Sequence, residues 1–178
     1  PGANGEWFSA DPDSMYHMRR VDRALSEGLP VAQHDRLLDF PARGELGAPI
    51  PWPPYYTYVG YAFARPGAPV EAQARRVHVE QVMARLPSLF AALASVLAAL
   101  AAYRLFGASG ALVAGVYHAF LFASLKYSYV GNADHHAFVS CLHAALLFVA
   151  SRAFEPQGLR SPKSGVRYGI AAGVLCGV

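Results

Sequence analysis

Asp134, His135 and His136 follow one another in a part of the chain that is otherwise apolar. Asp134 is the only carboxylate between Glu80 and Glu155, so its presence there needs a reason. An acid followed two positions later by a histidine can offer one oxygen and one imidazole nitrogen to the same cation. We predict that Asp134 and His136 bind a divalent ion, Mn²⁺ or another of similar chemistry.

The same three residues also allow a purely structural reading. A carboxylate at the start of a helix is stabilised by the helix dipole and can act as the N-cap, which would explain Asp134 alone. Adjacent helical positions diverge by about 100°. We therefore expect His135 to point away from His136 and to be an interfacial or structural residue. Two ligands do not complete a metal site, so further ligands must come from elsewhere in the chain.

A second group of acids, Asp11 and Asp13, precedes apolar residues at helical spacing that end at Gly28. This pattern predicts an amphipathic surface helix with Asp13 or Ser14 as its N-cap and Gly28 as its stop. Asp13 would then begin one helix as Asp134 begins another.

The composition separates a polar half of the chain from an apolar half. Hydrophobic residues make up 54% and charged residues 15%, and residues 86–151 hold only Arg104, Lys126 and Asp134 as charges. A helix needs about 20 apolar residues to cross a membrane. We predict an all-α polytopic membrane protein with a first external segment at residues 1–85 and a transmembrane part at residues 86–178.

The apolar half divides into four predicted transmembrane helices. The first two are joined by a tight turn at residues 104–110, and the next connection is a second external loop at residues 128–136. The predicted helices cover residues 86–104, 106–127, 132–152 and 168–178. The last one stops inside a hydrophobic run, and the chain opens without a signal-peptide pattern, so we expect a fragment of a larger protein rather than a complete four-helix one.

The basic residues predict the orientation. Four of them follow residue 151 in a short connection: Arg152, Arg160, Lys163 and Arg167. Such a connection is typical of the cytoplasmic side. Alternation then places residues 1–85 and the 128–136 loop on the external face, so that Asp13 and Asp134 could hold one cation beside a phosphate-bearing lipid.

The remaining external segment has two parts. Residues 39–63 are rich in Pro, Gly and aromatics, which favours extended chain and turns. We interpret the aromatic side chains there as membrane-interface anchors, namely Trp52, Tyr55, Tyr56, Tyr58 and Tyr61. Residues 71–86 have the pattern of a helix that leads into the first span.

Other polar groups in the apolar half carry weaker indications. His118 and His143 lie inside predicted spans, where both a functional role and a hydrogen bond to a neighbouring helix are open. Cys141 and Cys176 also lie in apolar segments, and no disulfide or zinc site is indicated. The formal net charge of +3 suits lipid headgroups, and no basic stripe with interleaved aromatics indicates nucleic-acid binding.

Three stretches resemble the catalytic subunit of oligosaccharyltransferases. "DSMYHMRR" at residues 13–20 resembles the first acidic motif of that family. Residues 39–56 resemble the Tyr-Pro, Gly and Trp-Pro-Pro portion of its first external loop. "GNADHH" at residues 131–136 resembles its second acidic motif, in which an acid is followed two positions later by Asp, Glu or His. Order and spacing agree across residues 7–155.

The resemblance implies a C-type glycosyltransferase, an integral multi-pass protein of the inner or plasma membrane with its site on the periplasmic or extracytoplasmic side. It would transfer a glycan from a polyprenyl-diphosphate-linked oligosaccharide to Asn in an Asn-x-Ser/Thr acceptor polypeptide. Asp13 and Asp134 would be catalytic ligands of Mn²⁺ or Mg²⁺. His136, where the commoner form has Asp, would be a further ligand. The candidate substrate-binding residues are His17, Arg19, Arg20 and Trp52.

Two parts of the family site do not occur in this sequence, a later external-loop Glu and the Trp-Trp-Asp region that reads the acceptor. The chain alone is therefore expected to be inactive. One alternative is another C-type transferase that passes a sugar from a lipid-phosphate donor to a lipid or polymer. The other is a non-enzymatic cation-binding membrane protein, such as half of a transporter, but its acids would lie at the middle of several spans.

Overall fold

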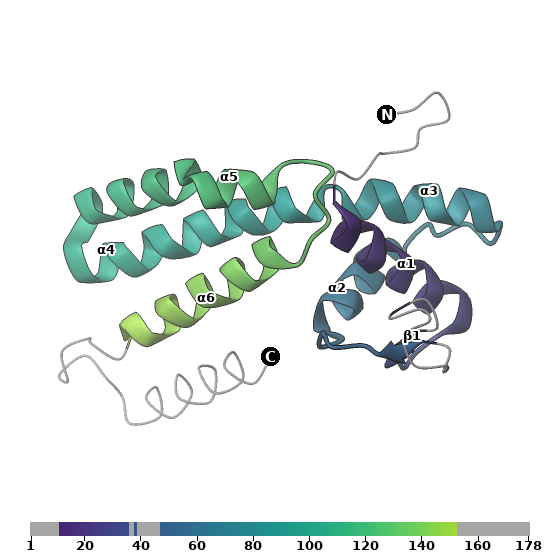
Figure 1. Cartoon of the computed structure of the whole chain (residues 1–178). Helices are drawn as coiled ribbons and strands as arrows, with labels where there is room; N and C mark the ends of the chain where they lie inside the picture. Colours follow the sequence, from purple (N-terminus) through teal and green to yellow (C-terminus); the bar gives the residue numbers. More distant parts are fainter. Residues whose placement is uncertain (1–10, 36–37, 39–46, 153–178) are drawn as a thin grey trace. The chain divides into compact units, whose positions relative to one another are not determined.

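The structure, a computed structural model, describes residues 11–35, 38 and 47–152. Its described part is mainly helical, as predicted, and divides into two compact units, Pro1–Ala84 and Arg85–Val178 (Figure 1). The first unit contains α1 (Pro12–Glu27), β1 (His34–Asp35), β2 (Ala48–Pro49), α2 (Tyr55–Ala64) and α3 (Ala72–Met83). The second contains α4 (Leu86–Phe120), α5 (Phe122–Ser128) and α6 (His136–Ser151). The strands form one short antiparallel pair.

Helix α1 confirms the predicted helix that ends at Gly28, but it begins earlier than expected. Its N-cap is Asp11, whose side chain accepts a hydrogen bond from the backbone N–H of Asp13 at 3.2 Å. The prediction of Asp13 or Ser14 as the cap was wrong. Pro12 lacks an N–H and fits the first helical position, so the residue before it takes the capping role.

Helix α2 lies where the sequence predicted extended chain and turns, so that prediction was wrong for this segment. Tyr56, Gly60 and Ala64 share one face of α2, and α2 packs against α1 and α3. A Cβ atom at Gly60 would lie 2.7 Å from both Val21 Cγ2 and Met83 Sδ. Gly60 therefore allows close helix packing there, and its intrinsic cost as a helix residue is offset by burial.

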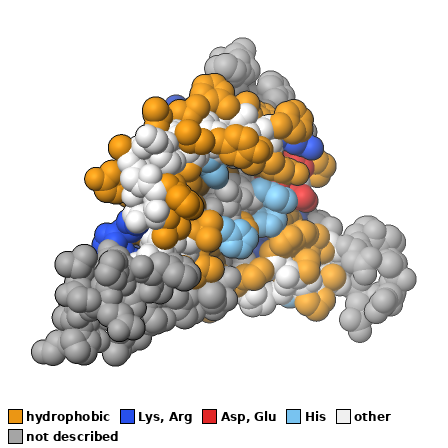
Figure 2. All heavy atoms as spheres, turned by 90° about the vertical axis from the view of Figure 1, so that its left-hand side faces the viewer, with side chains coloured by type: hydrophobic (Ala, Val, Ile, Leu, Met, Phe, Trp, Pro, Cys, Tyr) orange, Lys and Arg blue, Asp and Glu red, His pale blue; other side chains and the backbone are white. Residues whose placement is uncertain are grey.

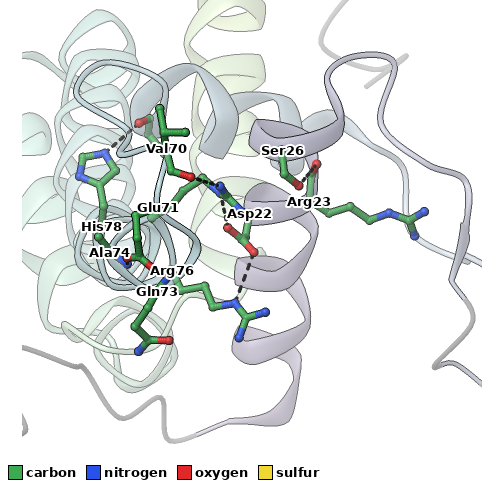
Figure 3. Close-up of polar contacts among 11 residues, drawn as sticks. Asp22, Arg23, Ser26, Val70, Glu71, Gln73, Ala74, Arg76 and His78 are labelled. Carbon is green, nitrogen blue, oxygen red and sulfur yellow. Dashed lines mark hydrogen bonds and ion pairs between the residues drawn. The ribbon is translucent and has the colours of Figure 1, made fainter.

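Helix α3 is the predicted helix before the first span, and polar contacts hold it in place (Figure 3). Glu71 caps it by accepting hydrogen bonds from the backbone N–H groups of Gln73 and Ala74, and these bonds lower the pKa of Glu71. Asp22 of α1 pairs with Arg75 at 2.8 Å and with Arg76 at 3.7 Å. The first unit is thus a three-helix packing fixed by ion pairs as well as by apolar contacts.

Helix α4 is a hairpin of two helices. Gly107 has φ 70° and ψ −163°, and the chain reverses within α4 (Figure 1). A Cβ at Gly115 in the second half would lie 3.1 Å from the Cβ of Ala99 in the first half, so the halves pack closely. The positive φ favours glycine. The turn predicted at residues 104–110 is confirmed.

The next two predicted helices have different bounds in the structure. Leu121 is extended, with φ −60° and ψ 131°, and separates α4 from α5 where one continuous helix was expected. Helix α6 begins at His136, not near Asn132. Gly131 has φ 105°, and the side chain of Asn132 donates a hydrogen bond to the carbonyl of Lys126 at 3.2 Å. These features hold residues 129–135 as a loop.

The second unit exposes a large apolar surface. Among the described residues, one helical run, Ala72–Phe120, contains a stretch that is long and apolar enough to cross a membrane, and α6 is a shorter apolar helix. Phe106, Phe120 and Phe122 are each more than 70% exposed. Hydrophobic side chains dominate the face shown in Figure 2. The predicted helix at 168–178 and the basic connection before it lie outside the described residues.

Candidate functional site

Asp134 lies in the loop that joins α5 to α6, and both of its carboxylate oxygens contact histidines. Oδ1 accepts a hydrogen bond from the backbone N–H of His135 at 2.6 Å and lies 2.7 Å from its Nδ1. Oδ2 lies 2.5 Å from Nδ1 of His136. The side chain of Asp134 is buried, whereas that of His136 is about half exposed. One carboxylate thus holds two imidazoles.

This geometry corrects the expected positions of the two histidines. The ring centroids of His135 and His136 lie 4.7 Å apart, so His135 does not point away from its neighbour. The expectation assumed that both residues belong to a helix that begins before Asp134. Because α6 begins at His136, Asp134 precedes the helix and its carboxylate reaches both rings.

The structure also argues against the N-cap reading of Asp134. The N-cap residue of α6 is His135, and no side chain caps this helix. The carboxylate of Asp134 instead accepts its bonds from the immediately following residues. The carboxylate of Asp134 therefore contacts the two histidines and does not cap the helix.

The electrostatics of this group favour an ionised acid. Burial raises the pKa of Asp134, but the hydrogen bond from His135 and the charges of His136 and His135 outweigh burial, so the pKa lies below its usual value. Asp134 is thus a carboxylate at neutral pH. A carboxylate beside two imidazoles is an oxygen and nitrogen donor set that fits Mn²⁺ or a similar divalent ion.

His136 is held from two sides. Its ring stacks on Tyr127, with centroids 4.4 Å apart and an interplanar angle of 9°, while Asp134 contacts Nδ1. A carboxylate on one ring nitrogen is a common way to orient the other nitrogen toward a metal. A cavity of about 180 Å³ lies beside this ring and also includes His118 and Ser140.

The first acidic motif has a different local structure. The carboxylate of Asp11 accepts a hydrogen bond from the backbone N–H of Asp13, and its Oδ2 lies 3.5 Å from Oγ of Ser14. Asp13 lies in the first turn of α1 and is exposed. Because Asp11 caps the helix, the side chain of Asp13 is not needed for capping. Asp13 and Asp134 belong to different units, and their convergence on one ion stays a prediction.

The predicted substrate-binding residues His17 and Trp52 belong to an aromatic cluster of the first unit. The ring of His17 lies 5.0 Å from that of Tyr56 and 6.3 Å from that of Trp52. Tyr16 lies 5.0 Å from Trp52. The cluster packs α1 against the segment that leads into α2, which gives these residues a structural role whether or not they bind substrate.

Arg19 and Arg20, the other two candidates, have unequal surroundings. Arg19 is partly exposed and forms an ion pair with Asp35 of β1. Arg20 is only 4% exposed, and its guanidinium carbon lies 5.7 Å from the centre of the Tyr16 ring. Sequence reasoning missed Asp35 because its partner is 16 residues away and no local pattern connects them.

His118 forms hydrogen bonds with neighbouring helices, which is one of the two roles considered for it from the sequence. Its Nδ1 lies 3.0 Å from Oγ of Ser95, and its Nε2 lies 3.4 Å from Oγ of Ser140. The ring therefore links both halves of α4 with α6. A hydrogen bond to neighbouring helices is confirmed for His118.

The chain matches a model of a known protein family. The model described as "Oligosaccharyl transferase STT3, N-terminal" matches residues 2–177, almost the whole chain. Comparison with curated proteins and with solved structures yields no match. The match agrees with the resemblance inferred from the two acidic motifs.

Proposed function

The chain belongs to the STT3 family of oligosaccharyl transferases, and we propose that it is the part of a membrane glycosyltransferase that carries the two acidic motifs of the active site. The full enzyme would transfer a glycan from a polyprenyl-diphosphate-linked donor to the Asn side chain of an Asn-x-Ser/Thr acceptor. The family membership supports a membrane transferase that acts in protein N-glycosylation.

The observation that carries this proposal is the carboxylate of Asp134 between two imidazoles, in a loop that joins two apolar helices. A lipid-linked donor can reach such a loop from the bilayer, because its isoprenoid tail stays in the hydrocarbon region. The exposed apolar side chains of α4 and α5 support a membrane location for the neighbouring helices. We place the site at the external face of a multi-pass protein in the inner or plasma membrane.

Each predicted site residue has its own part in the proposed reaction. Asp134 is ionised, so it can accept a hydrogen bond from an acceptor amide N–H and hold the amide nitrogen toward the sugar carbon. Asp134 also orients His136, which Tyr127 holds from the other side. A divalent ion held by Asp134, His136 and Asp13 would offset the negative charge that develops on the diphosphate leaving group.

The decisive test is Asp134→Asn in the full-length enzyme. Asn keeps the size of the side chain but removes its charge, so we expect glycan transfer to an acceptor peptide to fall at least about 100-fold while the amount of protein in the membrane stays the same. Glu80→Gln, at a half-buried acid of α3, is the matched control and should retain activity. Unchanged transfer in Asp134→Asn would exclude the proposed role.

A second experiment tests the membrane topology. Single cysteines at Val130, which is 47% exposed in the loop before α6, and at Ser164, in an otherwise cysteine-free chain, should be labelled by an impermeant reagent from opposite sides of the membrane. The reason is that the chain crosses once between them, through α6. Labelling of both from the same side would contradict the external location of Asp134.

A further inference from the structure

A cavity of about 500 Å³ lies beside the C-terminal half of α1, wholly within the first unit. Arg19, Arg20 and Arg23 line it from α1. Residues 28–32 and Asp35 form further walls, with Ile50 next to β2. The lining of the cavity therefore combines three arginine residues with several apolar residues.

Two carboxylates line the same cavity, and each is paired with one arginine. Arg19 pairs with Asp35, and Nε of Arg23 lies 2.7 Å from the carboxylate of Glu27. Three cations thus face two anions. Because the other two arginines are paired, the charge of Arg20 is the one that neither acid neutralises.

Among the described residues, no group forms a hydrogen bond with the buried guanidinium of Arg20. Its side chain is only 4% exposed, and none of its three guanidinium nitrogens has a hydrogen-bond partner within the part of the chain that the structure describes. The ring of Tyr16 lies near the guanidinium, and the negative charge of Asp35 raises the pKa of Arg20. Neither replaces the hydrogen bonds that a buried guanidinium loses with water. Burial accordingly lowers the pKa of Arg20.

We propose that this cavity binds a single oxoanion group, with Arg20 as its main partner. A guanidinium presents several N–H donors in a planar fork, which matches a carboxylate, sulfate or phosphate group. The cavity is larger than an inorganic anion, so it can admit a small organic molecule that carries the group. A sugar acid and a lipid headgroup share this chemistry.

The site is separate from the first acidic motif. Arg20 follows Asp13 by seven residues, about 10 Å along a helix. Glu27 and Asp35 would repel a ligand with several negative charges, and the carbonyl groups at the end of α1 would add to this repulsion. The cavity thus selects a group with one negative charge, which distinguishes it from a site for a diphosphate.

Thermal unfolding of the full chain in detergent tests the proposal. Acetate, methyl sulfate and glucuronate, which each carry one negative charge, are compared with chloride at equal ionic strength, and we expect the unfolding midpoint to rise with at least one oxoanion. Arg20→Met should abolish this rise or lower the affinity of the chain for the anion at least about tenfold. Without oxoanion, Arg20→Met should unfold at the same or a higher temperature, because the buried charge is gone.

The controls separate this site from general effects of charge. Arg76→Met removes a guanidinium that is 64% exposed on α3 and should keep the full oxoanion effect. Stabilisation by glucuronate would identify a sugar acid as the ligand class, and stabilisation in phosphatidylglycerol nanodiscs over phosphatidylcholine nanodiscs would identify a headgroup. The proposal is overturned if no oxoanion stabilises the native chain or if Arg20→Met keeps the native response. Because binding is measured without glycan transfer, the result is independent of the proposed enzymatic function.

Discussion

The two acidic motifs look alike in the sequence but use their carboxylates differently. At the start of α1, Asp11 accepts a hydrogen bond from the backbone and leaves Asp13 exposed. Before α6, Asp134 gives both oxygens to His135 and His136 and caps no helix. In the first motif the capping residue, Asp11, is thus a different residue from the predicted ligand, Asp13, whereas in the second motif the predicted ligand, Asp134, caps no helix.

This difference teaches that an acid near the start of a helix cannot be assigned from its position. The acid directly before the first helical residue, here Asp11, accepts a hydrogen bond from the backbone N–H at the start of the helix. An acid within the first turn of the helix, or one residue before its cap, is available for other partners. Asp13 and Asp134 are of this second kind.

The largest effect is expected from paired substitutions in the first motif. Asp13→Asn should reduce glycan transfer by the full-length enzyme at least about 100-fold, as Asp134→Asn should, because both lose a charge that a cation requires. Asp11→Asn should leave transfer nearly unchanged, since Asn caps a helix as well as Asp does. Equal losses in the two variants would remove the division of roles within this motif.

The two histidines give the next effect in size. His136→Ala should raise the Mn²⁺ concentration needed for half-maximal transfer by about 10- to 100-fold, because it removes a predicted ligand. His135→Ala should raise it less, since the backbone N–H of residue 135 still bonds to Asp134. A larger effect of His135→Ala would reverse the roles that we assign to the rings.

The pH dependence of stability gives a smaller effect. The pKa of Asp134 lies below its usual value, so its ionised form stabilises the folded chain. This stabilisation should be fully present above about pH 5 and disappear as the pH falls through the lowered pKa. The difference in thermal midpoint between the native chain and Asp134→Asn, measured from pH 6 to pH 3, should shrink accordingly. A difference that grows toward acid pH would show that the ionised form does not stabilise the fold.

The smallest effect concerns the cap. Asp11→Ala should lower the free energy of unfolding by about 1 kcal/mol, because the backbone N–H of Asp13 loses its partner. Asp11→Asn is the matched control and should keep most of this stability. Thermal unfolding would measure both, and a full loss of stability in Asp11→Asn would mean that Asp11 acts through its charge.

Much of the fold follows from local sequence patterns. The absence of charges over long runs indicated the apolar helices, and Gly107 lies within the turn predicted between the first two. Helix α2 was missed because its stability depends on packing of Gly60 against Val21 and Met83, which are distant in the sequence. Single-residue signals such as Pro and Gly cannot reveal that kind of contact.

The candidate site was predicted in part for a similar reason. The isolation of Asp134 among apolar residues identified it correctly as unusual, and His136 contacts it. The position of His135 depends on where α6 begins, which the backbone at Gly131 and the side chain of Asn132 decide. The pairing of Arg19 with Asp35 required the fold of the first unit.

The hydrogen bond between Ser95 and His118 has a consequence for biogenesis in the proposed membrane topology. It joins the two halves of α4 across the reversal at Gly107, and the partners are 23 residues apart. A nascent chain that leaves the translocation channel as a closed hairpin would enter lipid with this imidazole already bonded, before α6 has been synthesised. Ser140 would complete the arrangement later. The order of synthesis thus matches the order in which the polar groups of this helical bundle find their partners.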